Sequence, residues 1–242
     1  TSAPMSEAEH AVHADGYGDD LFTEPPGDPA TLANLGPLAP LAGVWEGIRG
    51  DDHHPVLGGG ALTIYVERYE LVPIDFQTNG PQLFYGLRYH THIHEVGKVE
   101  TFHDQVGYWL WEPATKTVVH TLTIPRGQVV VAGGQAEPDA TEFEVSATLG
   151  TGVYGISAVP FIDRAFRTLS YRLKVTTQPD GRWSYDGNAI LEIPDRDEPF
   201  EHTDANTLTR VAPPSLNPLA LALVRNGSLG IGDLRNESGN LL

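Results

Sequence analysis

Apolar and polar residues alternate in short runs between Gly43 and Val211. Alternation with a period of two is typical of β-strands, because successive side chains point to opposite faces of a sheet. Turn sequences such as "EVGK", "EPATK", "IPRG" and "QPDGR" separate many of the runs. The pattern predicts about ten strands, at residues 43–49, 61–71, 81–93, 98–112, 117–124, 127–134, 141–149, 167–177, 182–193 and 201–211.

Long helical patterns are scarce, so the fold class predicted is all-β. A long series of antiparallel strands can remove its unpaired edges by closing into a barrel, and about eight to ten strands leave room for one small ligand. We therefore expect a ten-stranded up-and-down antiparallel β-barrel of the lipocalin or fatty-acid-binding-protein type. A two-sheet sandwich is the alternative. Short helical turns are predicted in "LGPLAPLAG" and "AVPFIDRAF".

The segments outside the strand pattern differ in composition. Residues 1–35 form an acidic lead-in rich in proline and glycine, of which residues 1–4 are expected to remain from recombinant expression. The barrel domain is predicted to span residues 36–211. Residues 212–242 form a C-terminal extension, and its apolar stretch "LNPLALALV" is expected either to pack across the barrel mouth or to join a homodimer.

Composition narrows the choice of partner. The chain has 32 acidic and 15 basic residues, and its net charge of -17 argues against binding to nucleic acid or to an anionic membrane surface. There is no cysteine, so thiolate chemistry and cysteine metal sites are excluded. No apolar run approaches the roughly 18 residues of a membrane span. A small-molecule ligand and a cytoplasmic location are the expectations that follow.

Two histidines lie on strands with mixed faces. In the strand over residues 98–112, His103 shares a face with Gln105, Gly107 and Trp109. A glycine inside a strand often marks a bend or the close approach of a ligand, so His103 is expected to point into a cavity if this face is internal. A hydrogen-bonded surface histidine is the other interpretation. His202, near the start of the last strand, is either a polar surface residue or a ligand.

Other polar clusters are weaker candidates. His90, His92 and His94 share one strand face at a spacing that suits a zinc or copper site, but the opposite face is more apolar, so the three histidines are expected to face solvent. The segment "DDHHP", residues 51–55, is interpreted as a polar turn. The sequence contains no G-x-S-x-G elbow, no P-loop and no dinucleotide fingerprint.

Three motifs together resemble a known family. "GVWEG", which contains Trp45, is similar to the G-x-W-x-G signature of the nitrobindins, which are ten-stranded haem-binding barrels. "FHDQVGYW" places His103 and Gly107 where that family has a distal histidine followed by a glycine-aromatic pair. "EHTDANTLTRV" places His202 where the closing strand of the family carries its proximal iron ligand. The resemblance covers roughly residues 36–211.

The resemblance implies a function and a set of site residues. His202 would be the metal ligand of ferric haem b, and His103 would be the catalytic residue on the distal side. The cofactor-binding residues would be His202, His103, Trp45 and Gly107. The activity implied is binding of nitric oxide or isomerisation of peroxynitrite to nitrate. One histidine is enough, because the porphyrin supplies the four other nitrogen ligands of the iron.

A cavity for porphyrin needs apolar walls. The candidates for these walls are Trp45, Phe84, Tyr85, Trp109, Phe143, Tyr171 and Leu173. The same barrel without iron would instead be a carrier of a fatty acid or another apolar molecule, and this is the alternative function. A second open question is whether Asp204, two residues after His202, or another acceptor holds the imidazole in place.

Overall fold

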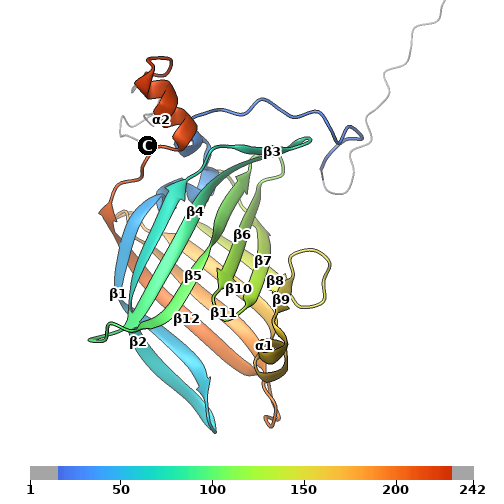
Figure 1. Cartoon of the computed structure of the whole chain (residues 1–242), viewed down its shortest axis with the longest axis vertical. Coiled ribbons are helices and arrows are strands. Elements are labelled where there is room, and N and C mark those ends of the chain that lie inside the picture. The colour runs from blue at the N-terminus through green and yellow to red at the C-terminus, as the bar shows by residue number, and fades with distance from the viewer. Residues whose placement is uncertain (1–15, 231–242) are drawn as a thin grey trace, which may run out of the picture.

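The computed structural model describes residues 16–230 and contains a closed barrel of ten antiparallel strands (Figure 1). Each barrel strand pairs with the next along the chain, and β12 pairs with β1 to close the ring. The barrel strands are β1 (Gly43–Val56), β2 (Gly59–Pro73), β4 (Gln82–Glu95), β5 (Thr101–Glu112), β6 (Thr117–Ile124), β7 (Gln128–Gln135), β8 (Glu142–Thr148), β10 (Arg167–Thr177), β11 (Trp183–Glu192) and β12 (Phe200–Ala212). The short strands β3 (Gln77–Asn79) and β9 (Ile156–Ala158) pair with β4 and β7.

The barrel prediction is confirmed, and closure of the ring rules out the two-sheet sandwich. All ten predicted segments form strands, because alternate side chains point inward and lose their contact with water. In β6, for example, Val118, His120 and Leu122 are buried on the inner face. Both predicted helical turns also form, as η2 (Gly36–Leu41) and α1 (Pro160–Ala165).

One end of the barrel is filled by side chains. Two 3-10 helices, η1 (Thr31–Asn34) and η2, place Leu32, Leu35, Leu38 and Leu41 in the same core cluster as the inner faces of the strands. The indole Nε1 of Trp45 donates to the carbonyl of Leu41 at 2.7 Å, which fixes the first strand to this plug. The packed core therefore begins before residue 36, the predicted start of the barrel domain.

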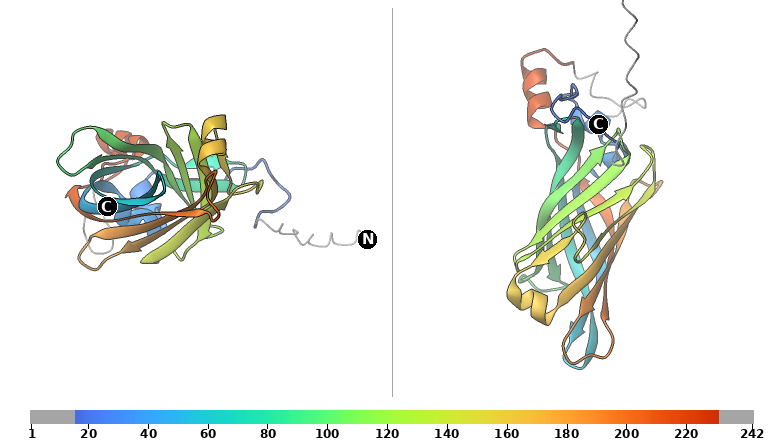
Figure 2. Two further views of the ribbon diagram at one scale, coloured as in Figure 1. Left: turned by 90° about the horizontal axis from the view of Figure 1, so that it is seen from below. Right: turned by 90° about the vertical axis from the view of Figure 1, so that its right-hand side faces the viewer.

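The described part of the C-terminal extension, residues 212–230, lies at the same plugged end. Helix α2 (Pro218–Arg225) is at the top of Figure 1 beside the lead-in, and Figure 2 shows the same arrangement from two other directions. The Asn217 amide donates to the Pro29 carbonyl at 2.9 Å and to Asp75 Oδ1 at 2.8 Å. The extension thus joins the lead-in to β2–β3 at the plug. The apolar stretch 216–224 thus lies at the plugged end, and within residues 212–230 the extension does not line the cavity at the other end.

At the opposite end the wall opens between β7 and β8. These strands share one residue pair, Gly133 with Ser146, while the start of β7, Gln128–Val130, pairs with β9 instead. The chain between β8 and β10 forms the loop that contains β9 and α1, and α1 lies beside this opening (Figure 1). Within residues 16–230, no helix has the length and apolar character needed to cross a membrane.

The interpretation of "DDHHP" as a polar turn was wrong. Residues 51–55 lie inside β1, which runs on to Val56 and pairs with both β2 and β12. Their alternation places Asp52 inward and buried while Asp51 is exposed. A run of four polar residues resembles a turn, but the long neighbouring strands supply pairing partners that keep it extended.

Candidate functional site

The barrel encloses a cavity of about 670 Å³ at the end away from the plug. This volume is within the range of sites that bind small molecules, roughly 300–1,000 Å³. Apolar and aromatic side chains make up much of the wall, including Trp109, Leu122, Tyr171, Leu173 and Trp183. Phe161, Ile162 and Phe166, from α1 and its C-terminal end, line the mouth.

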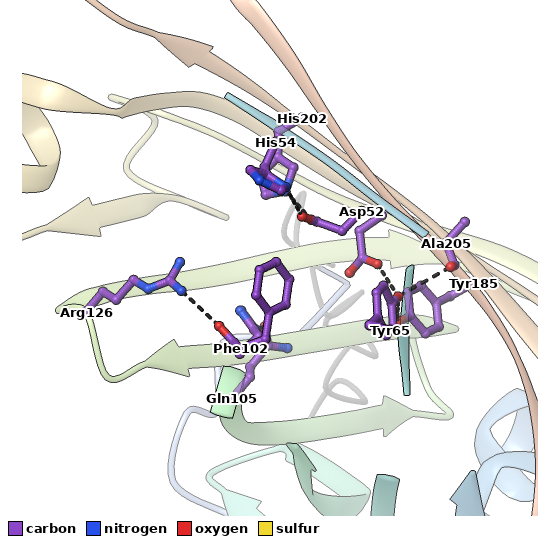
Figure 3. Close-up of polar contacts among 11 residues, drawn as sticks. Asp52, His54, Tyr65, Phe102, Gln105, Arg126, Tyr185, His202 and Ala205 are labelled. Carbon is purple, nitrogen blue, oxygen red and sulfur yellow. Dashed lines mark hydrogen bonds and ion pairs between the residues drawn. The ribbon is translucent and has the colours of Figure 1, made fainter. Parts of the chain in front are cut away.

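His202 lines this cavity and is held by a carboxylate from the neighbouring strand. Its Nε2 donates to Asp52 Oδ1 at 2.7 Å, and Nδ1 of His54 donates to the other oxygen, Oδ2, at 2.6 Å (Figure 3). Burial alone would raise the pKa of Asp52, but the hydrogen bonds and charges of His202 and His54 outweigh it and the pKa is lowered. An ionised Asp52 therefore fixes the orientation of His202.

His103 lines the same cavity from β5. Its Nε2 donates to Gln105 Oε1 at 3.2 Å. Burial lowers the pKa of His103, the hydrogen bond with Gln105 opposes this, and the positive charge of Arg126 lowers the pKa further. His103 is therefore neutral near pH 7, with one ring nitrogen that accepts a hydrogen bond. The charges of Asp52 and His202 also influence His103, so the two predicted histidines share one electrostatic environment.

A hydrogen-bonded chain continues from His103 along the wall. Gln105 Nε2 donates to the Tyr89 hydroxyl at 2.8 Å, and that hydroxyl is 2.9 Å from Nε2 of His120. Nδ1 of His120 is 3.4 Å from the Tyr171 hydroxyl. The imidazole ring of His120 stacks on the Trp109 ring, and the two ring centroids are 4.0 Å apart. Burial lowers the pKa of His120 to about 3, so this histidine is neutral and serves the network as a donor and an acceptor.

Two further carboxyl groups line the cavity, Glu67, which is buried, and Asp204, which is half-buried. Glu67 accepts from Thr91 Oγ1 at 2.6 Å, from the Tyr185 hydroxyl at 2.8 Å and from the Asn206 amide at 2.9 Å. Burial raises its pKa, although these three donors oppose the rise. Asp204 accepts from the Tyr65 hydroxyl, and burial followed by the charge of Glu67 raises its pKa well above the usual value.

The predicted site residues do not all reach the cavity. His202 and His103 line it, and so do three predicted wall residues, Trp109, Tyr171 and Leu173. Trp45 does not: it is fully buried in the plugged end, edge-on to Trp183. The other three predicted wall residues, which do not line the cavity either, are Phe84, Tyr85 and Phe143.

Gly107 is also outside the cavity lining. It lies between β4 and β6, and a Cβ at this position would be 1.9 Å from the Thr121 carbonyl oxygen and 3.0 Å from Cε1 of Tyr89. Gly107 was expected to mark a bend or the close approach of a ligand, but the groups that approach it are the neighbouring strand and a tyrosine ring. The glycine allows β5 and β6 to pack closely under Tyr89.

The three-histidine face of β4 points outward as predicted. Tyr89, Thr91 and Ile93 are buried on the opposite face. His90 pairs with Asp104 at 3.0 Å and His92 contacts Thr101 Oγ1 at 3.0 Å. Among residues 16–230, no group of three or more histidine or acidic side chains is arranged to hold a metal ion.

Several cavity residues were missed by the sequence reasoning. Asp52, His54 and Arg126 were placed in turns. Glu67 and His120 were inside predicted strands, and each is the polar member of an otherwise apolar inward face: Glu67 lies between Tyr65 and Tyr69. A polar residue on an otherwise apolar strand face could have identified Glu67 and His120 from the sequence, since such a residue needs buried hydrogen-bond partners or a ligand.

The family is established by comparison with known proteins. Residues 34–210 match the family model described as "THAP4-like, heme-binding beta-barrel domain". No curated protein gives a significant match to the sequence. Among solved structures, the crystal structure of Rv2717c from M. tuberculosis is similar in fold, with a TM-score of 0.53 and 20% identity, over 76% of this chain and 99% of that one. The chain therefore belongs to the nitrobindin family of haem-binding β-barrels, as the three motifs predicted.

Proposed function

We propose that the cavity binds ferric haem b, that His202 would hold its iron, and that the protein binds nitric oxide or isomerises peroxynitrite to nitrate. The observation that carries the proposal is the pairing of His202 with Asp52 at the wall of the cavity, in a chain of a haem-binding family. Histidines that bind metals commonly donate their second ring N–H to a carboxylate, which fixes the ring and makes it a stronger donor.

The residues present fit a porphyrin. The cavity is large enough for a small-molecule cofactor and its walls carry several aromatic rings, which suit a flat apolar ring system. With its Nε2 proton donated to Asp52, a neutral His202 has its lone pair on Nδ1. Bound haem would supply an iron centre that accepts nitric oxide or an oxygen atom of peroxynitrite as a ligand.

His103 is proposed to act on the ligand side of the cavity. Its proton is committed to Gln105, so its second nitrogen can accept a hydrogen bond from a bound water or ligand. Its lowered pKa keeps it neutral and avoids a second cation near the iron. In isomerisation of peroxynitrite, His103 would orient the bound oxyanion through a water without transferring a net proton.

The assignment of His202 as the iron ligand is tested by titrating the purified protein with hemin. We expect a saturable one-to-one shift of the Soret band. His202→Ala should weaken hemin binding by at least about 10-fold, since loss of a residue that merely supports a ligand already costs about 10–100-fold. His90→Ala, which changes an exposed histidine outside the cavity, is the matched control. Identical spectra and affinities for His202→Ala and the parent protein would refute the assignment.

Turnover is tested separately by stopped-flow decay of peroxynitrite with measurement of the nitrate yield. His103→Leu should retain hemin binding but react more slowly. Equal rates for the variant and the parent, at equal haem occupancy, would remove His103 from the reaction.

The second candidate function is a haem-free carrier of a fatty acid or a similar apolar molecule. It is favoured by the apolar side chains of Phe161, Ile162 and Phe166 at the mouth, which a hydrocarbon chain could contact on entry. A protein that ignores hemin but binds a fluorescent fatty acid would support it. A cytoplasmic location and a homodimer remain predictions, to be tested by fractionation and by light scattering.

A further inference from the structure

Charged residues are distributed unevenly along the cavity wall. Three acidic residues line it, Asp52, Glu67 and Asp204. Arg126 is the only arginine or lysine among the lining residues that the structure describes. In a chain with a net charge of -17, a lone guanidinium at this position is unexpected on composition alone.

Arg126 lies in the turn between β6 and β7, at the mouth. Its Nη2 donates to the Phe102 carbonyl of β5 at 3.0 Å, which holds the guanidinium beside the strand that carries His103 (Figure 3). The remaining N–H groups of a guanidinium with five donors can face a ligand. Arg68, Arg172 and Lys116 illustrate the contrast, since each pairs with a glutamate. Within the described part of the chain, Arg126 has no such carboxylate partner.

The deeper part of the cavity is unsuitable for an anion. A ligand carboxylate placed there would meet the carboxyl groups of Glu67 and Asp204, which already accept hydrogen bonds from tyrosine, threonine and asparagine donors. Burying an unpaired charge is strongly unfavourable, whereas burying a hydrocarbon group beside Trp109 or Leu173 is favourable. An amphipathic acid would therefore enter with its apolar part first.

We propose that Arg126 binds the carboxylate of an amphipathic acid and so fixes the orientation of this ligand, with its apolar body inside the cavity and its carboxylate at the mouth. The proposal rests on the proposed function only in using the same cavity. The carboxylate can belong to a haem propionate or to the head group of a long-chain fatty acid, because a guanidinium recognises both in the same way.

The test compares each acid with its uncharged ester. Hemin and hemin dimethyl ester are titrated into the full chain, as are a fluorescent fatty acid and its methyl ester. Arg126→Gln should weaken binding of the free acid by about 2- to 5-fold, the size expected for a partly exposed ion pair. Arg126→Glu should weaken it further, by roughly 10-fold, because attraction is replaced by repulsion. Neither variant should change the affinity for the esters.

Arg164→Gln is the matched control. Arg164 is an exposed arginine in α1 near the mouth, where its guanidinium lies 6.0 Å from the Phe161 ring centroid, but it does not line the cavity. The Arg164→Gln variant changes the net charge of the protein by the same amount as Arg126→Gln, but it should leave the affinity for both acids unaltered. Arg126→Lys retains the charge, and it should lose less affinity than Arg126→Gln.

The outcomes separate this proposal from the proposed function. Equal affinities of Arg126→Gln and the parent for a free acid that the parent binds would overturn the role of Arg126 and leave haem or fatty-acid binding intact. An equal loss for the acids and the esters would also overturn it, because the change would then be structural. An effect confined to hemin or to the fatty acid identifies which carboxylate is recognised. If the parent binds neither acid, both proposals fail.

Discussion

The two ends of the barrel are built from the same strands but have opposite interiors. At the plugged end, Leu35, Leu38, Leu41 and Trp45 fill the space between the strands and are fully buried. At the other end the inward positions hold His120, Glu67, Asp204 and His202, which surround a cavity. The first interior consists of apolar contacts, and the second consists of hydrogen-bonded polar groups and aromatic rings.

This difference indicates that the plugged end of the barrel serves mainly stability and the cavity end serves mainly ligand binding. Apolar packing at the plug contributes stability without any specific chemistry. Buried polar groups around the cavity contribute less, because each must first lose its hydration and then recover that loss in hydrogen bonds. We therefore expect substitutions at the plug to act on stability and substitutions at the cavity to act on ligand binding and on the response to pH.

The largest effect is expected at the plug. Trp45→Ala should lower the free energy of unfolding by about 3–5 kcal/mol, because it leaves a void among fully buried side chains. Urea denaturation measures this change. Hemin affinity, compared at equal fractions of folded protein, should not change, since Trp45 does not line the cavity. Ile48→Ala, at an exposed position of the same strand, should alter stability by less than about 0.5 kcal/mol. If folded Trp45→Ala lost hemin binding, the separation between a stabilising plug and a ligand-binding cavity would be contradicted.

An intermediate effect is expected where the two regions meet. Gly107→Ala should cost about 3 kcal/mol, at the upper end for overpacking, because its Cβ would be 1.9 Å from a backbone oxygen of Thr121. Thermal unfolding followed by circular dichroism measures the loss. At Gly152, an added Cβ meets nothing within 4 Å, so Gly152→Ala should be nearly neutral. Equal melting temperatures for Gly107→Ala and the parent would show that the strands separate easily here.

The smallest effect is expected at the cavity and depends on pH. The pKa of His120 is about 3 in the folded protein, against an ordinary value of about 6.5. The stability that this neutral histidine contributes is present above pH 6.5 and is lost as the pH falls toward 3. Relative to His120→Gln, the parent should lose about 2 kcal/mol between pH 7.5 and pH 5.

Urea denaturation of both proteins at the two pH values gives this difference. Acidic residues common to both proteins, such as Glu67 with its raised pKa, cancel in the comparison. His90→Gln, at an exposed histidine, should not reproduce the change. A constant difference between the parent and His120→Gln at pH 7.5 and pH 5 would mean that His120 becomes protonated without opening the network.

Much of the architecture was determined by the sequence alone. Alternating side chains and turn residues located all ten barrel strands, and the three motifs identified the family and two histidines that line the cavity. These features could be recognised because the face of a strand on which a side chain lies depends only on its position in a period of two. The outward face of His90, His92 and His94 followed from the same rule.

Tertiary structure alone decided which inward residues meet a cavity and which meet the plug. Alternation gives the face but not the height along the barrel axis, and in the structure Trp45 and His202 both point inward but lie at different levels. The partner of His202 could not be found from its own strand either: Asp52 is 150 residues away and reaches it because β1 pairs with β12. Pairing between distant strands is a property of the closed ring, and the closed ring places these two residues side by side.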